Sequence, residues 1–143
     1  MKTILFLSLF FLSLFESIAS EVVTLDDLKW QNRIVICLTN DRKLTDSLLQ
    51  ELEANEMEIQ DRDIVYFLIN PTASLSNSNN PISLEDMGDL IHNYFDNDDR
   101  LKVLLIGKDG GVKMEADNLD LEYIFRLIDS MPMRRQEMKV DTD

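Results

Sequence analysis

The chain has 143 residues, a length that suits one domain and leaves little room for a second. Its 27 acidic residues outnumber its 14 Lys and Arg, and the net charge of −13 argues against binding to nucleic acid or to an anionic membrane surface, because both need clustered basic side chains. One cysteine and one histidine exclude an internal disulfide framework, a four-thiolate metal site and a His-rich metal site.

Residues 1–19 have the pattern of a secretory signal peptide. A basic start is followed by an apolar run from Ile4 to Phe15, which is too short to cross a bilayer as a helix, since that takes about 20 residues. The small residues of Ser17-Ile18-Ala19 predict cleavage after Ala19, with cleavage after Ser20 as the alternative. A buried N-terminal helix is the competing interpretation, although the run has no polar face. We therefore expect a secreted or periplasmic protein with no membrane anchor once the signal peptide is removed.

Three short segments of the remaining chain are apolar without alternation: residues 34–38, 64–69 and 103–106. This pattern is typical of strands covered on both faces, as parallel strands usually are. Two segments between them have helical spacing, with apolar residues at 44, 48, 49 and 52 and at 87, 90, 91, 94 and 95. The second of these follows a capping box at Ser83-Leu84-Glu85-Asp86. A last helix is expected from about Asn118, and Pro132 should stop or bend it.

The segments outside these elements predict turns and loops. Residues 107–114 contain Asp109-Gly110, a pair that tolerates the backbone of a tight turn, so we expect the third strand to continue into an antiparallel hairpin. Residues 71–81 are rich in Ser and Asn between two prolines and predict a polar surface loop. Residues 96–100 form a shorter acidic loop.

The predicted order is β-α-β-α-β-β-α. We expect right-handed crossovers to join the first three strands, and the hairpin to add an antiparallel strand to a mixed sheet. This is the order of a thioredoxin-like domain, so the predicted class is α/β, with a three-layer thioredoxin-like domain that ends in a hairpin and a helix. The domain is expected to span residues 24–138, followed by an acidic tail over residues 139–143.

Residues 102–113 (KVLLIGKDGGVK) and 128–138 (IDSMPMRRQEM) resemble a known family, the domain of unknown function 4174. Trp30, Arg33 and the pair Arg62-Asp63 fit the same family. It comprises small secreted bacterial proteins, and similar domains occur in vertebrate extracellular-matrix proteins of the sushi-repeat type. The resemblance covers about residues 24–138. It implies a thioredoxin-like, more narrowly peroxiredoxin-like, fold and brings no catalytic residue or cofactor with it.

Cys37 is the candidate for redox chemistry. A thioredoxin-type thiol follows the first strand and begins the next helix, where the helix dipole lowers its pKa. Cys37 instead lies within the first apolar segment, and residues 39–43, where a reactive thiol belongs, contain no cysteine. We expect a buried structural thiol; a thiol-dependent peroxidase or reductase that uses Cys37 is the alternative.

Two features of the sequence are candidate metal sites. His92 lies off the apolar stripe of its helix, and no cysteine or second histidine is suitably placed to complete a site, so we expect a surface histidine. Asp96-Asn97-Asp98-Asp99 begins like a calcium loop but lacks the later glycine and acid of that motif. A solvated loop is expected, with weak calcium binding as the alternative, because acids are poorly placed at a helix C-terminus. No cofactor is predicted.

Arg134 and Arg135 are adjacent basic residues in a very acidic chain. They can pair internally with Asp63, Asp129 or Glu137, dock on the carbonyls of the last helix, or bind an external anion with their forked donors. Arg62, which precedes the second strand, has the same two interpretations. These three arginines are the predicted binding residues, and the predicted partner is another protein or a small anionic ligand. We therefore expect an exported, non-catalytic binding or envelope-support module rather than an enzyme.

Overall fold

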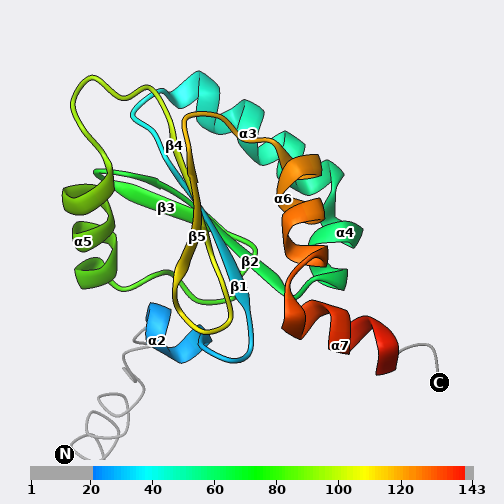
Figure 1. Cartoon of the computed structure of the whole chain (residues 1–143). Helices are drawn as coiled ribbons and strands as arrows, with labels where there is room; N and C mark the ends of the chain where they lie inside the picture. The colour runs from blue at the N-terminus through cyan, green and yellow to red at the C-terminus, as the bar shows by residue number, and fades with distance from the viewer. Residues whose placement is uncertain (1–20, 141–143) are drawn as a thin grey trace, which may run out of the picture.

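The computed structural model describes residues 21–140, so the predicted signal peptide and the last three residues of the predicted tail lie outside the described residues. Within that range no helix is long and apolar enough to cross a membrane. The elements follow one another along the chain as shown in Figure 1: α2 (Leu25–Leu28), β1 (Arg33–Leu38), α3 (Arg42–Ala54), α4 (Glu56–Asp61), β2 (Ile64–Asn70), β3 (Ala73–Ser76), α5 (Leu84–Tyr94), β4 (Lys102–Ile106), β5 (Val112–Ala116), α6 (Leu121–Asp129) and α7 (Pro132–Val140).

The strands form one mixed sheet in the order β3-β2-β1-β4-β5. β1 pairs in parallel with β2 and antiparallel with β4, and β4 pairs antiparallel with β5 in the predicted hairpin. The mixed α/β class is therefore confirmed. The prediction that a right-handed crossover joins the third strand in parallel is wrong, since β4 runs against β1. An apolar segment shows that both faces of a strand are covered, and it does not specify the direction of the strand.

The polar loop predicted over residues 71–81 contains an edge strand, β3, which pairs antiparallel with β2. Asn77 extends this pairing beyond the strand through its side chain. Its Oδ1 accepts a hydrogen bond from the Tyr66 amide at 2.9 Å, and its Nδ2 donates to the Ile64 carbonyl at 3.1 Å. The prediction of a loop is wrong for residues 73–76, because backbone pairing to β2 imposes a strand on a sequence with one large apolar side chain, Leu75.

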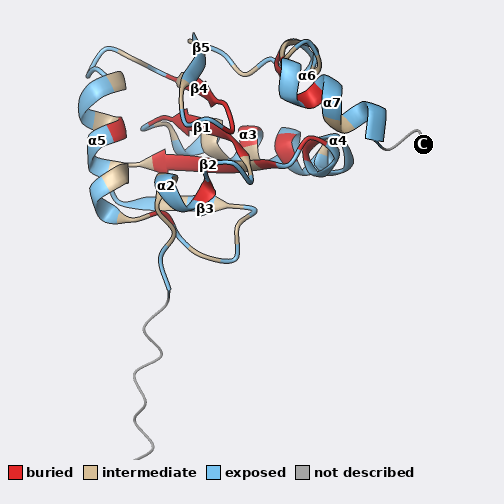
Figure 2. Ribbon diagram, turned by 60° about the horizontal axis from the view of Figure 1, so that its bottom comes forward, coloured by how far each residue is buried: buried red, intermediate tan, exposed pale blue. Residues whose placement is uncertain are grey.

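Helices cover both faces of the sheet and enclose the buried strands, as Figure 2 shows. The side chains of β1 alternate between the two resulting cores. Val35 and Cys37 pack with residues of α3, α4 and α6. Ile34, Ile36 and Leu38 pack with residues of α2 and α5 on the opposite face. The arrangement is thus three layers, with an apolar core on each side of the sheet.

The three predicted helices are present as α3, α5 and α6. The Ser83 side chain accepts the Asp86 amide at 3.1 Å, so the predicted cap of α5 forms. α6 ends at Asp129, and a separate helix, α7, begins at Pro132. Proline suits the first turn of a helix because the amide at that position needs no partner. The break predicted at Pro132 is confirmed, and it is followed by a helix that the sequence did not predict.

Two non-glycine residues at one end of the sheet have left-handed backbones, Trp30 with φ 65° and Asp63 with φ 51°. Trp30 precedes β1, and its amide donates to the Lys108 carbonyl at 2.7 Å. Asp63 precedes β2, and its carbonyl accepts the Arg33 amide at 2.9 Å. This conformation costs roughly 1 kcal/mol or more for a side chain with a Cβ, so surrounding contacts must impose it. These bonds fasten the starts of β1 and β2 to each other and to the β4–β5 turn.

Candidate binding site

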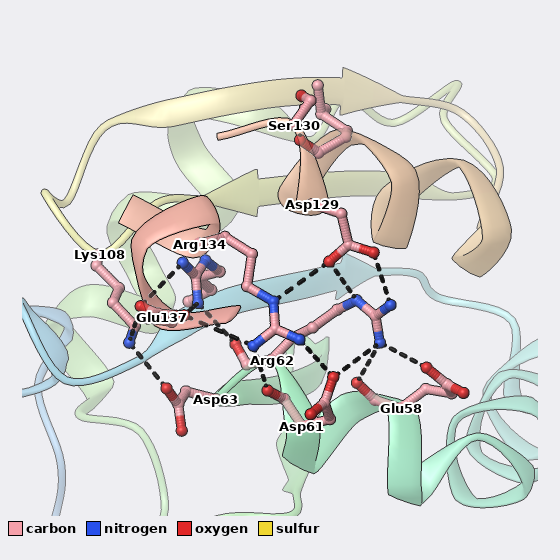
Figure 3. A network of polar contacts seen from close by, with 11 residues as sticks. Glu58, Asp61, Arg62, Asp63, Lys108, Asp129, Ser130, Arg134 and Glu137 are labelled. Carbon is pink, nitrogen blue, oxygen red and sulfur yellow. Dashed lines mark hydrogen bonds and ion pairs between the residues drawn. The ribbon is translucent and has the colours of Figure 1, made fainter. Parts of the chain in front are cut away.

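A cluster of charged side chains lies at the end of the sheet where β1 and β2 begin and β4 ends (Figure 3). We call it the ionic cluster. Its cations are Arg33, Arg62, Lys108 and Arg134, and its carboxylates are Glu58, Asp61, Asp63, Asp129 and Glu137. Within residues 21–140, every charged residue that is buried is one of these four cations. A buried cation needs charged or hydrogen-bonding partners, so the contacts of each decide what it can do.

Arg62 lies between α4 and β2 and joins α4 to α6. Its Nε donates to Asp129 Oδ1 at 3.1 Å and its Nη2 to Asp129 Oδ2 at 2.8 Å, the forked geometry specific to a guanidinium. Its Nη1 contacts the Glu58 carboxylate at 2.6 Å, and its Cζ lies 4.6 Å from the centroid of the Phe125 ring. This predicted binding residue is therefore engaged within the protein.

Arg134 and Arg135 occupy different environments although they are adjacent. Arg134 is 5% exposed. Its Nη1 donates to the Asp61 carbonyl at 2.8 Å, its Nη2 pairs with the Asp61 carboxylate, and its Nε donates to Asp129 Oδ1 at 3.3 Å. Arg135 is exposed, and no ion pair holds its side chain within residues 21–140. Internal pairing thus describes Arg134, whereas Arg135 faces solvent.

Glu137, on α7, is surrounded by cations. Its Oε1 accepts from Lys108 Nζ at 2.7 Å and from Arg33 Nη2 at 3.2 Å. Its Oε2 accepts from Arg33 Nη1 at 3.2 Å and lies 3.7 Å from Arg134 Nη1. Arg33 is 1% exposed, and its Nη1 also donates to the Arg62 carbonyl at 2.9 Å. Glu137 therefore joins α7 to β1 and to the β4–β5 turn.

These contacts hold the central carboxylates in the charged form. Burial by itself raises the pKa of Glu137, but hydrogen bonds from Lys108 and Arg33 outweigh burial, and the pKa is lowered. Asp129 shows the same balance: burial opposes ionisation, and its arginine partners, Arg62 first, lower the pKa. α7 is consequently held to the sheet by charged carboxylates at neutral pH.

A cavity of about 420 Å³ adjoins the ionic cluster. Arg33 and Lys108 form its charged side, and its remaining lining comes from the β4–β5 turn and the start of α7: Gly107, Asp109, Lys113, Met131, Pro132 and Met133. Residues 131–133 give it an apolar wall. A cavity of this size, with an apolar wall and a few convergent polar groups, has the usual make-up of a small-ligand site.

Comparison with family models places the chain in a known family. The model of a domain of unknown function, DUF4174, matches residues 24–137. The chain belongs to this family. Comparisons with curated proteins and with solved structures gave no match. The family resemblance read from the sequence is thus confirmed, and the matched span of the DUF4174 domain includes every residue of the ionic cluster.

Cys37 of the DUF4174 domain is not placed for thiol chemistry. It lies within β1 and is fully buried, as predicted. Burial, together with the nearby charge of Glu51, raises the pKa of its thiol to about 12. The position after β1, where a thioredoxin thiol begins the next helix, is occupied by Asp41. Its carboxylate accepts the Lys43 and Leu44 amides at 3.0 and 3.2 Å and caps α3.

The metal alternatives of the DUF4174 domain gain no geometric support. Among the described residues, no group of three or more His, Cys, Asp and Glu side chains is placed to hold a metal ion. The acidic segment after α5 forms a turn in which the Asp99 carboxylate accepts the Asp96 amide at 2.9 Å. His92 is exposed near the end of α5.

The sequence did not identify Arg33 and Lys108 as site residues. A usable signal was present, because Arg33 opens an apolar strand and Lys108 closely follows another. In the observed antiparallel register Ile34 pairs with Ile106, which brings the two cations to the same end of the sheet. The parallel direction predicted for β4 placed them at opposite ends.

Proposed function

We propose that the protein is a non-catalytic binding or envelope-support module with a thioredoxin-like fold that acts outside the cytoplasm. The observation that carries the proposal is the burial of Cys37 within β1. Thiolate chemistry needs an accessible thiol with a lowered pKa, and Cys37 has the opposite of both properties. The environment of Cys37 therefore argues against the alternative of a peroxidase or reductase that depends on this residue.

The topology supports the thioredoxin-like part of the proposal. β1, α3 and β2 form a parallel unit, and after α5 the chain returns through the hairpin β4–β5 to α6. β1 lies between β2 and β4 in the sheet, with β4 antiparallel to it. This is the arrangement expected of a thioredoxin-like core, to which β3 adds an edge strand and α7 a C-terminal helix.

The partner in this proposal is another protein or a small anionic ligand. The buried cations gather at one end of a chain whose net charge is −13, and a cavity with an apolar wall lies beside them. Of the three arginines proposed from the sequence, Arg135 is exposed to an incoming anion, whereas Arg62 and Arg134 are already paired.

The location outside the cytoplasm rests on the signal-peptide pattern of residues 1–19. We expect the exported protein to begin at Ser20 or Glu21. Intact-mass measurement and N-terminal sequencing of material recovered outside the cytoplasm test this. A soluble cytosolic protein that keeps residues 1–19 would disprove the export proposal.

Alkylation tests the non-catalytic proposal, and it is unambiguous because Cys37 is the single cysteine of the chain. We expect iodoacetamide to label the urea-unfolded protein fully and to leave the folded protein unlabelled over the same time at pH 7.5. The Cys37→Ala variant serves as the blank. Rapid labelling of the folded protein, or reduction of hydrogen peroxide by the wild type but not by Cys37→Ala, would show that the proposal is wrong.

A further inference from the structure

We infer that Arg33 and Lys108 form a carboxylate-binding site, and that Glu137 occupies it as an internal ligand which an external carboxylate carried on an apolar group replaces. This inference rests on the proposed binding function and names the chemistry of the ligand. The site contains none of the three arginines predicted from the sequence, because its two cations come from the start of β1 and the β4–β5 turn.

The two cations are arranged as a receptor for one carboxylate. Arg33 presents Nη1 and Nη2 to the two oxygens of Glu137, each at 3.2 Å, and Lys108 Nζ adds a contact of 2.7 Å to one of them. Both side chains are fixed independently of Glu137. Arg33 donates to the Arg62 carbonyl at 2.9 Å, and Lys108 pairs with Asp63 at 2.8 Å. The receptor therefore stays oriented when its carboxylate leaves.

The cavity beside the receptor accounts for the apolar part of the ligand. Arg33 and Lys108 line the cavity and also donate hydrogen bonds to the Glu137 carboxylate. Residues 131–133 form the apolar wall of the cavity. A ligand whose carboxylate meets the two cations thus places its neighbouring carbon atoms against this wall. Burial of apolar surface there adds to the charged contact.

The helix that carries Glu137 is attached mainly by charge. Arg134 is the one buried residue among the nine of α7, all of which are described; Met133 and Met138 are partly covered, at 39% and 37% exposed, and Val140 is 76% exposed. A terminal helix without a fully buried apolar side chain opens at low free-energy cost compared with the core. An external carboxylate can therefore compete with Glu137 without unfolding the sheet.

The surroundings favour a single negative charge over a doubly charged phosphate. Asp63 lies 2.8 Å from Lys108 Nζ, and Asp109 lines the cavity together with its partner Lys113. These carboxylates repel added negative charge, whereas a monoanion simply substitutes for Glu137. Inorganic phosphate is accordingly the negative control.

Binding to the full mature chain tests the inference, with two probes that carry a carboxylate on an apolar group: 4-phenylbutyrate, and a tetrapeptide that ends in a free C-terminal leucine. Their amides and inorganic phosphate are the controls. We follow the backbone amide signals of Gly107, Lys108 and Met133 by NMR titration. Tighter binding of 4-phenylbutyrate than of the peptide identifies a small molecule as the source of the carboxylate. Tighter binding of the peptide identifies the C-terminus of a protein.

Removing the internal competitor should strengthen binding. We expect Glu137→Gln to bind the preferred probe about tenfold more tightly than the wild type, because a site occupied by its own side chain binds in proportion to its open fraction. Lys108→Met should weaken binding about tenfold. Glu122→Gln, which removes an exposed carboxylate on α6 outside the ionic cluster, is the matched control and should leave the affinity unchanged.

Hydrogen exchange of the wild type keeps the test decisive if Glu137→Gln does not fold. A saturating probe should speed amide exchange within residues 135–140, because it displaces Glu137, whereas the contacts of Arg134 with Asp61 keep the start of α7 and the apolar wall in place. Equal affinity of Glu137→Gln and wild type, equal binding of acid and amide, binding away from Gly107 and Met133, or unchanged exchange in α7 would each overturn the inference. The two proposals fail separately. A negative result in these binding tests would leave the alkylation result for Cys37 unchanged. Rapid alkylation of Cys37 would overturn the proposed function and would leave the carboxylate site unaffected.

Discussion

Replacement of Arg134 by alanine tests whether the ionic cluster is what holds α7 to the domain. The loss of one partner from a fully buried ion pair costs about 3–5 kcal/mol. The side chains of Asp61 and Asp129, the partners of Arg134, are 57% and 33% exposed, and Asp129 keeps its contact with Arg62. Water therefore relieves part of the penalty, and we expect a loss of about 2 kcal/mol in the free energy of unfolding.

Thermal unfolding followed by circular dichroism measures this loss. For a domain of this size, about 2 kcal/mol corresponds to a decrease of roughly 8 °C in the Tm. Arg135→Ala is the matched control, because the neighbouring side chain is exposed, and it should change the Tm by less than about 2 °C. Arg134→Lys keeps the charge without the fork and should lose about half as much as alanine. Equal Tm values for the two alanine variants would refute the reasoning.

Acidification should destabilise the domain from about pH 4.5 downward. The pKa of Glu137 is lower in the folded than in the unfolded protein, so its charged form stabilises the fold above the unfolded pKa, and this stability is lost as the pH falls. A Tm that stays constant down to pH 2.5 would contradict this. Cys37→Ala should lower the free energy of unfolding in urea by about 1 kcal/mol, because removal of the buried thiol leaves a small cavity. No loss at all would contradict this and show that the cavity collapses. Gly88→Ala, on the exposed side of α5 with open space for a Cβ, should stabilise by about 0.5–1 kcal/mol. Gly110→Ala should destabilise by about 1 kcal/mol or more, because its φ of +81° strains a residue that has a Cβ. Reversed signs for the two glycine variants would disprove this comparison.

Apolar periodicity located the elements that bury a face. The stripe of α5 and the uninterrupted apolar runs of β1, β2 and β4 all report burial, so their positions followed from the sequence. β3 did not, because an edge strand of four residues is held by backbone hydrogen bonds that almost any sequence can make. The direction of β4 could not be predicted either, since a strand buried on both faces has the same apolar pattern beside parallel and antiparallel neighbours.

The ionic cluster was only partly predictable for a related reason. Asp129 and Glu137 were foreseeable partners of Arg134 because they lie within one or two helical turns of it in the sequence. Asp61 was not, since it lies 73 positions away and ends α4, a helix that was not predicted as a separate element. Long-range charge pairs have no periodicity of their own, so they become visible only once the directions of the strands are known.

The left-handed residue before β1 is also the single tryptophan of the chain, and this determines what fluorescence can report. Trp30 is 67% exposed in the folded protein, so its indole is already hydrated and its emission should change little on unfolding. Its amide is nevertheless bonded to the carbonyl of Lys108, at the edge of the carboxylate site. Intrinsic emission is therefore a poor probe of global denaturation for this domain. It is instead a local reporter, whose spectrum should shift to the blue when a partner covers the β4–β5 turn.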